Sequence, residues 1–108
     1  MILGVFSDPH ANLAATRWAL DAARHVGAER LVCLGDLVGY GPEPTGVIDR
    51  IRSLGIPTIR GNYDDGIGNR RGECGCYYTT EQAKVDGAAS YAFTESALGD
   101  ADLAWLAG

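Results

Sequence analysis

The sequence predicts an α/β fold that begins with a β-α-β-α-β unit. Three short apolar runs without helical periodicity, at 1–6, 31–34 and 56–60, predict strands, and the segments between them carry helix signals. Such alternation joins adjacent parallel strands through right-handed crossovers. The 108 residues, of which 46% are hydrophobic, are enough for one domain with a modest core.

The first strand, at 1–6, is followed by a loop and then by a helix. Asn12 is the expected N-cap of this helix, which runs to about Val26 and stops at Gly27. Its narrow apolar stripe consists of Leu13, Leu20 and the alanines around them. Small alanine side chains allow a helix to lie close to a sheet.

The second strand, at 31–34, has four apolar residues in a row, a pattern typical of a strand buried on both faces. Gly35 then lets the backbone turn sharply, and Asp36 follows at the carboxyl end of the strand. Pro44 fits the first turn of a second helix, which ends at Gly55. The apolar positions of that helix are Val47, Ile48, Ile51 and Leu54.

The third strand, at 56–60, leads into a polar, glycine-rich loop region. Thr79 and Gln82 resemble a capping box, which predicts the start of another helix. The apolar positions of that helix are Val85, Ala88, Ala89, Ala92 and Phe93, and Gly87 weakens it. Asp100 is expected to cap a short last helix that carries Leu103, Trp105 and Leu106.

Charge and hydropathy exclude some classes of protein. Nine basic and fourteen acidic residues give a net charge of −5, which argues against non-specific nucleic-acid binding. No apolar run approaches the roughly 20 residues of a membrane span, and the chain begins with a strand rather than a signal peptide. The odd count of three cysteines, with Cys33 in a predicted buried strand, favours a reducing, cytoplasmic location.

Two features of the glycine-rich region have alternative interpretations. Cys74-Gly75-Cys76 could be a metal or redox pair, but a lone C-x-C is a weak signal, and a structural loop is favoured. Arg70 and Arg71 could reach a phosphate, although such pairs are more often solvated.

The loops after the three predicted strands carry metal-ligand side chains. Asp8 and His10 follow the first strand, Asp36 the second, and Asn62 and Asp64 the third. Because the carboxyl ends of parallel strands open on one edge of a sheet, these residues are expected to converge. Their carboxylate, imidazole and amide groups suit a divalent metal, and close carboxylates repel each other unless a cation lies between them. The alternative is three unrelated turn residues.

The order and spacing of these motifs resemble a known family. The motifs are Asp8-x-His10, Gly35-Asp36 running into Gly41-Pro42, and Gly61-Asn62-x-Asp64. They are similar to the first three signature blocks of the calcineurin-like metallophosphoesterases. VGYGP and CGCY make the cytoplasmic bacterial and archaeal phosphodiesterase branch the closest likeness. The resemblance implies a two-sheet, four-layer sandwich flanked by helices.

The resemblance also implies a cofactor and a reaction. Asp8 and His10 would hold one divalent ion, Asp36 would bridge two, and Asn62 would hold the second. Manganese is favoured over iron, zinc and nickel. A hydroxide activated between two metals would hydrolyse a phosphoester, expected to be a small-molecule or nucleotide-type phosphodiester. The expected catalytic residues are Asp36, Asn62, Tyr63 and Asp64.

Two departures from the family pattern matter. Many members have a histidine at the position of Tyr63, and a phenol, with a pKa of about 10, is a poorer acid. The family also takes three further histidine ligands from later blocks, whereas this chain has only His10 and His25. The resemblance therefore predicts that 1–108 form the amino-terminal part of a single, truncated domain, with an exposed sheet edge open to self-association and little or no hydrolysis on its own.

Two other functions are weighed against the phosphoesterase. A catalytically weak or inactive module of the same fold, which binds a partner protein, agrees with Tyr63 and with the missing histidines. A plain nucleotide-binding α/β domain is disfavoured because no G-x-G-x-x-G follows the first strand.

Overall fold

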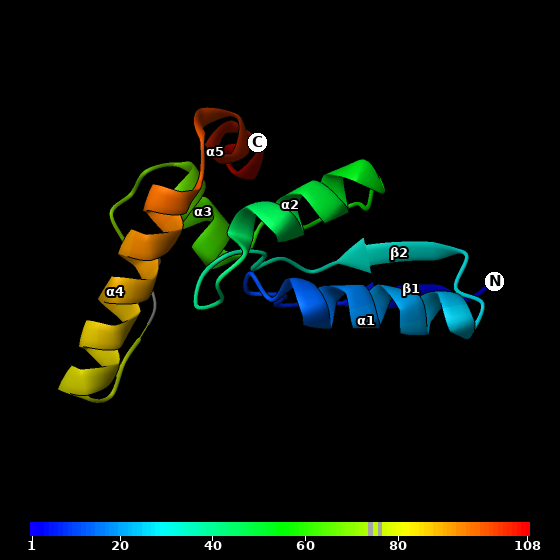
Figure 1. The fold of residues 1–108 in the computed structure, drawn as a ribbon, viewed down its shortest axis with the longest axis horizontal. Helices are drawn as coiled ribbons and strands as arrows, with labels where there is room; N and C mark the ends of the chain where they lie inside the picture. Colours follow the sequence, from blue (N-terminus) through cyan, green and yellow to red (C-terminus); the bar gives the residue numbers. More distant parts are fainter. Residues whose placement is uncertain (74, 76) are drawn as a thin grey trace.

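The computed structural model describes residues 1–73, 75 and 77–108, so Cys74 and Cys76 lie outside the described residues. The elements are, in order, β1 (Leu3–Phe6), α1 (Leu13–His25), β2 (Arg30–Cys33), α2 (Pro44–Ser53), α3 (Asn62–Gly68), α4 (Glu81–Ala97) and α5 (Asp100–Ala107) (Figure 1). None of the described helices is both long and apolar enough to cross a bilayer.

The sheet is parallel, as predicted, but among the described residues it has two strands instead of the expected three. β1 pairs with β2 so that Gly4 lies opposite Leu31 and Phe6 opposite Cys33. The expected third strand, at 56–60, runs parallel to β2 but forms only one bridge, from Thr58 to Cys33, so its assignment as a strand is wrong. Pro57 has no N–H and joins the pairing only through its carbonyl, which accepts from the Cys33 N–H.

The first two helices confirm their predicted signals. The Asn12 side chain accepts the N–H of Ala15 at 3.0 Å and so caps α1, and Gly27 just beyond the helix has a left-handed φ of +85°. α2 begins at Pro44 and buries Val47, Ile48 and Ile51 completely. Leu54, expected on the same face, is the C-cap and is exposed.

The segment after the third apolar run, expected to be a loop, forms α3. Asp64 and Asp65 lie in its first turn, where negative charge is favourable, and the Asp64 carboxylate accepts the Gly61 N–H at 3.0 Å. Tyr63 and Ile67 are buried and anchor this short helix in the core. Tertiary packing thus overrides its weakly helical sequence.

α4 forms where a helix was predicted, but its cap and its buried face differ. Thr80, not Thr79, is the N-cap, and its hydroxyl accepts the N–H of Ala83 at 3.0 Å. The expected apolar face is wrong, since Val85 and Phe93 are 60% and 48% exposed. The buried residues are Gly87, Tyr91 and Thr94. Among the described helices and strands, α4 lies against α2 and α3, and it projects from the body of the molecule (Figure 1).

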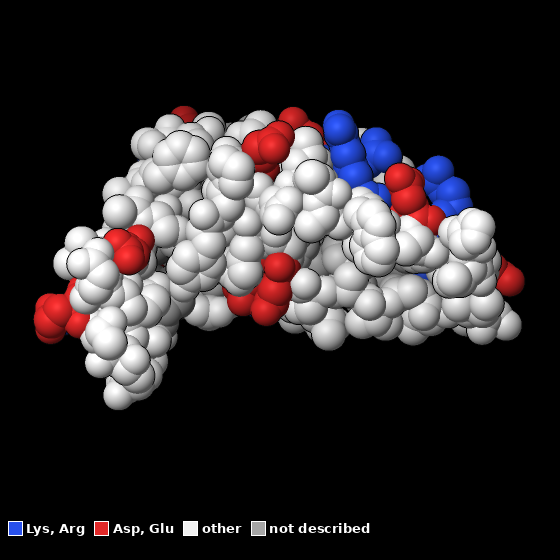
Figure 2. Space-filling view, turned by 60° about the horizontal axis from the view of Figure 1, so that its bottom comes forward, with Lys and Arg blue, Asp and Glu red and all other residues white. Residues whose placement is uncertain are grey.

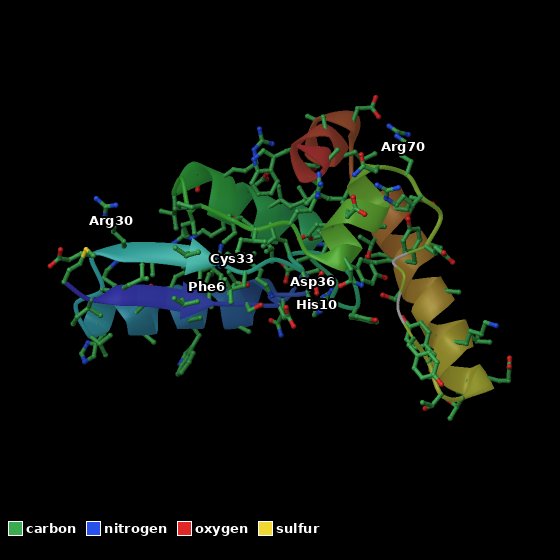
Figure 3. The ribbon with its side chains drawn as sticks, turned by 180° about the vertical axis from the view of Figure 1, so that it is seen from behind. Phe6, His10, Arg30, Cys33, Asp36 and Arg70 are labelled. Carbon is green, nitrogen blue, oxygen red and sulfur yellow. The ribbon has the colours of Figure 1, made fainter. Side chains whose placement is uncertain are left out.

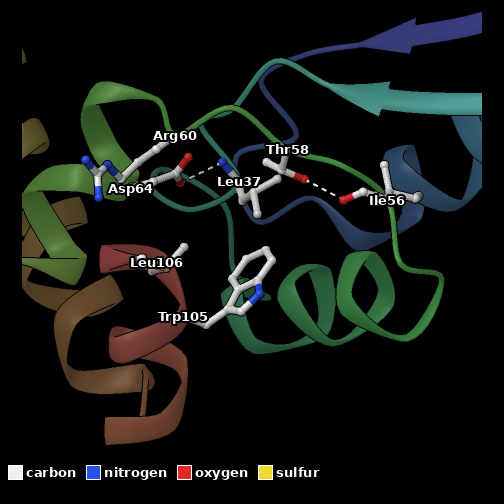
Figure 4. A pocket seen from close by; sticks show the side chains of 8 residues that line it. Leu37, Ile56, Thr58, Arg60, Asp64, Trp105 and Leu106 are labelled. Atoms are coloured by element: carbon white, nitrogen blue, oxygen red, sulfur yellow. Dashed lines mark hydrogen bonds between the residues drawn. The ribbon is translucent and has the colours of Figure 1, made fainter.

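α5 packs against α3. Its N-cap is Gly99, so Asp100, the expected cap, is instead the first helical residue. Leu103 and Leu106 are buried, as expected, and Trp105 is partly buried. A hollow of about 430 Å³ lies beside α5, and its lining includes Arg60, Asp64, Trp105 and Leu106 (Figure 4).

One face of the sheet is covered and the other is not. Gly4 faces α1, where an added Cβ would lie 3.5 Å from that of Ala23. The opposite face carries Leu3, Val5, Leu34 and Ile59, which are 45–60% exposed. Viewed from behind, the strands lie in front of α1 (Figure 3). On another side of the molecule, basic side chains gather at one end, whereas acidic side chains are spread across the surface (Figure 2).

Candidate metal centre

The loops that follow β1 and β2 continue the pairing of the strands. Asp8 N–H donates to the Gly35 carbonyl at 2.9 Å, and His10 N–H donates to the Asp36 carbonyl at 3.0 Å. The next contact, from Ala11 N–H to the Leu37 carbonyl, is 2.8 Å long. These bonds hold the two loops side by side at the carboxyl edge of the sheet.

Asp8, His10 and Asp36 come together at this edge. Each offers one ligand atom, and the three atoms lie within 4.8 Å of one another. Asp8 is exposed, while the other two are partly buried (Figure 3). We call these three residues the metal cluster. Carboxylate oxygens and an imidazole nitrogen at this separation fit a divalent cation, which would also offset the repulsion between the carboxylates.

A backbone contact orients His10. Its Nδ1 lies 2.8 Å from the carbonyl oxygen of Val38. Because a carbonyl only accepts hydrogen bonds, Nδ1 carries the proton and Nε2 keeps its lone pair for a metal ion. A neutral imidazole held this way is the form that ligates metals in proteins.

The backbone around the metal cluster is strained. Among the described residues other than glycine, left-handed φ angles occur at Asp8 (55°), His10 (41°), Ala11 (57°), Asp36 (55°), Tyr40 (63°) and Arg70 (53°). All but Arg70 lie in the two loops that form the cluster. Such conformations each cost about 1–3 kcal/mol and persist where surrounding structure enforces them, which is common at functional sites.

The third loop joins the site through Asp36. The backbone N–H of Tyr63 donates to Asp36 Oδ1 at 3.0 Å. Gly61 lies against the same carboxylate so closely that an added Cβ would collide with it. Asn62 stands between these two residues in sequence, on the surface, as the first residue of α3. The structure therefore brings the predicted third loop next to Asp36.

Asp64 lies in the interior, behind the contact between Asp36 and the third loop. It is 2% exposed, and its carboxylate accepts N–H bonds from Asp36 and Leu37, both at 2.8 Å, and from Gly61 at 3.0 Å. Burial raises the pKa of Asp64, and the three N–H bonds act against that shift. The side chain ties the second loop to the third.

Tyr63 is buried, with 1% of its surface exposed. Its hydroxyl lies 3.1 Å from Ser90 Oγ on α4, and Gly39 packs on its ring so closely that an added Cβ would collide with it. Burial raises the pKa of the phenol, which makes Tyr63 a still weaker acid.

The sequence did not predict several side chains that lie beside the site. Tyr40 lies against His10, and Ser90 and Tyr78 bond to Tyr40 from 50 and 38 residues away in sequence. In the sequence, Tyr40 stands between two glycines in VGYGP, and nothing local predicts its contact with His10. Arg70 and Arg71, considered as phosphate contacts or a solvated pair, are exposed but ion-paired, with Asp100 at 3.0 Å and Asp65 at 2.8 Å.

Comparison with known proteins agrees with this geometry. The calcineurin-like phosphoesterase superfamily domain matches residues 1–105. A metallophosphoesterase from Sphaerobacter thermophilus has a similar structure, with a TM-score of 0.71 and 28% sequence identity over 96% of this chain and 39% of that chain. An uncharacterised protein of Methanocaldococcus jannaschii is 38% identical over 66 residues, which are 61% of this chain and 27% of the relative.

The chain thus spans about a quarter of the curated relative and about two fifths of the solved structure that it matches. The family match covers nearly its whole length, and the α/β arrangement corresponds to the start of a metallophosphoesterase fold. The chain belongs to the calcineurin-like phosphoesterase superfamily.

Proposed function

We propose that this chain supplies the first ligands of a two-metal site that hydrolyses phosphodiesters. The observation that carries the proposal is the metal cluster, in which ligand atoms of Asp8, His10 and Asp36 lie within 4.8 Å. Divalent ions at such a site bind and neutralise phosphoryl oxygens and activate water. They would also attract an anionic substrate to a protein whose net charge is −5.

Each residue has a distinct part in the proposed site. In this proposal Asp8 and His10 would hold the first ion, and Asn62 would hold the second. Asp36, whose Oδ1 accepts the Tyr63 N–H, would bridge the two ions. Asp64 acts as a positioning residue through its three backbone contacts. That Tyr63 assists the leaving group stays a prediction. Its burial and its raised pKa argue against that role.

Manganese is the proposed metal, with iron, zinc or nickel as the other candidates for a mixed oxygen and nitrogen donor set. The proposed location is the cytoplasm, because Cys33 is buried and unpaired. We also propose that 1–108 form one part of a single domain, whose remaining ligands lie in segments that this chain does not contain.

A manganese titration by calorimetry tests the site. Wild type is expected to bind Mn²⁺, and Asp36→Asn to abolish the heat signal, because the bridge serves both ions. Asn62→Ala is expected to weaken binding less, because it removes a ligand of only one of the two ions. Asp49→Asn, an exposed carboxylate on α2, is the matched control and should bind like wild type. Equal losses in Asp36→Asn and Asn62→Ala would exclude a bridging role for Asp36.

The second candidate is a catalytically inactive module that binds a partner protein. The buried Tyr63, at a position where many relatives have histidine, favours it. The rate at which the chain hydrolyses bis-p-nitrophenyl phosphate in the presence of Mn²⁺ measures its phosphodiesterase activity directly. Little or no turnover is expected from these 108 residues. Failure to bind Mn²⁺ at all would favour the module, and robust turnover would exclude it.

A further inference from the structure

An exposed aromatic side chain lies against the metal cluster. The ring centroid of Tyr40 is 5.0 Å from that of His10, with the two planes at 76°. The Tyr40 ring also lies 5.3 Å from the ring of Tyr63, which is itself 6.1 Å from that of His10, so the three rings form one group. Tyr40 nevertheless remains 53% exposed. The ring therefore forms part of the surface directly beside a proposed metal ligand.

The backbone at Tyr40 adopts a costly conformation to place the ring there. Its φ of +63° lies in the left-handed region, which residues other than glycine rarely occupy. The neighbouring positions cannot carry a side chain, because a Cβ at Gly39 would collide with Tyr63 and a Cβ at Gly41 with the His10 carbonyl. A residue only half removed from water gains little burial energy to offset this strain.

Contacts from α4 and from the segment before it hold the exposed ring in place. The Tyr40 N–H donates to Ser90 Oγ at 2.7 Å, and Ser90 also bonds to the Tyr63 hydroxyl. The Tyr40 hydroxyl lies 2.9 Å from that of Tyr78. Both ends of Tyr40 are thus fixed before any ligand arrives. A rigid aromatic surface loses little conformational freedom on binding and is well suited to stacking.

We propose that Tyr40 is a specificity-determining residue, which stacks on the planar organic group of an aryl or nucleobase-bearing phosphoester. The phosphoryl group lies at the metal cluster, and the group attached to it extends over the Tyr40 ring. The 5.0 Å between the His10 and Tyr40 rings puts both parts of such a molecule within reach at once. This inference rests on the proposed function and adds a substrate class to it.

The test compares one probe that carries an aromatic ring with one that carries a short alkyl group. Phenyl phosphate and ethyl phosphate are titrated by calorimetry into the Mn²⁺-loaded chain. Wild type is expected to bind phenyl phosphate about tenfold more tightly, in line with aromatic stacking energies. With each variant titrated at saturating Mn²⁺, Tyr40→Ala should weaken phenyl phosphate binding to within about twofold of ethyl phosphate binding.

Three further variants separate stacking from structural effects. Tyr40→Phe and Tyr78→Phe each remove the bond between the two hydroxyls but keep both rings, so the preference for phenyl phosphate should persist. Tyr77→Ala removes an 88% exposed tyrosine next to Tyr78 but keeps the Tyr40 ring, so it should bind both probes like wild type. A circular dichroism spectrum of each variant would check that the variant is folded.

The outcomes distinguish this inference from the proposed function. Binding of both probes with equal affinity by wild type would overturn the role of Tyr40 and leave the phosphoesterase site standing. A preference for phenyl phosphate that persists in Tyr40→Ala would also overturn the role of Tyr40 and leave the phosphoesterase site standing. Absence of Mn²⁺ binding would overturn the proposed site and the inference together.

Discussion

Asp64 connects two of the three loops that build the site. Its carboxylate accepts three backbone N–H bonds, and only 2% of the residue is exposed. In Asp64→Asn an amide nitrogen replaces one acceptor oxygen and faces donors. The free energy of unfolding should fall by about 3 kcal/mol, measured by urea denaturation. Asp49→Asn is the control, and an equal change in both variants would contradict the role of Asp64.

The loss in unfolding free energy caused by Asp64→Asn should also depend on pH. Burial raises the folded pKa of Asp64 above its unfolded value, so the folded state binds the proton more tightly. The stability that this proton contributes is present below the unfolded pKa and is lost as the pH rises through the folded pKa. The difference in unfolding free energy between wild type and Asp64→Asn should therefore shrink as the pH rises from about 3 to 7, and a growing difference would exclude a raised pKa.

At the residue scale, the sequence predicted the convergence of Asp8, His10 and Asp36 better than the contacts that surround them. Asp8, His10 and Asp36 each follow an apolar run at the same end of a parallel unit, so local pattern and topology were enough to bring them together. The contact between Tyr40 and Ser90 spans 50 residues and depends on where α4 docks. No local pattern carries that information.

Gly87 lies where α4 packs against the side chain of Tyr78. It is buried, and an added Cβ would collide with the ring of Tyr78, which bonds to Tyr40. Alanine normally stabilises a helix interior over glycine by about 1 kcal/mol. Gly87→Ala should instead be neutral or destabilising, because Tyr78 has to move. In a Tyr78→Ala background the same change should stabilise by about 1 kcal/mol, which a double-mutant cycle measures.

The control for this cycle is the Tyr40→Phe background. It removes the hydroxyl contact but keeps the Tyr78 ring, so the collision remains. If Gly87→Ala stabilises wild type as much as it stabilises Tyr78→Ala, the glycine has no role in docking.

The elements were predicted well where their signals were local. Asn12, Gly27 and Pro44 mark helix ends, and all three stand where expected. The third strand failed because strand assignment requires neighbours, and 56–60 has only one bridge to β2. α3 was missed because its glycines suggest a loop, while burial of Tyr63 and contact with α5 stabilise the helix. The buried face of α4 depends on the same tertiary contacts.

At the scale of the molecule, the uncovered sheet face predicts behaviour in solution. Leu3, Val5, Leu34 and Ile59 form an apolar surface that water contacts in the monomer. The chain is expected to self-associate through this face and the adjoining sheet edge as its concentration rises. Sedimentation velocity should detect the association, and Val5→Lys combined with Ile59→Lys should reduce it about tenfold or more.

Trp18→Lys is the control for this prediction. Trp18 is 74% exposed on α1, away from the sheet face, so its replacement should leave self-association unchanged. A monomeric wild type at high concentration would contradict the prediction, as would an equal effect of Trp18→Lys.

The backbone bonds between the first two loops also bear on how the protein folds. They join Asp8, His10 and Ala11 to residues 27 or 26 positions along the chain, so they form only after the crossover through α1 has closed. A slip of one residue in the pairing of β1 with β2 would move each loop donor to another carbonyl and disperse the ligands. Metal uptake during refolding would therefore report the moment at which the strands reach their native register, and an ion that binds only then would trap that register.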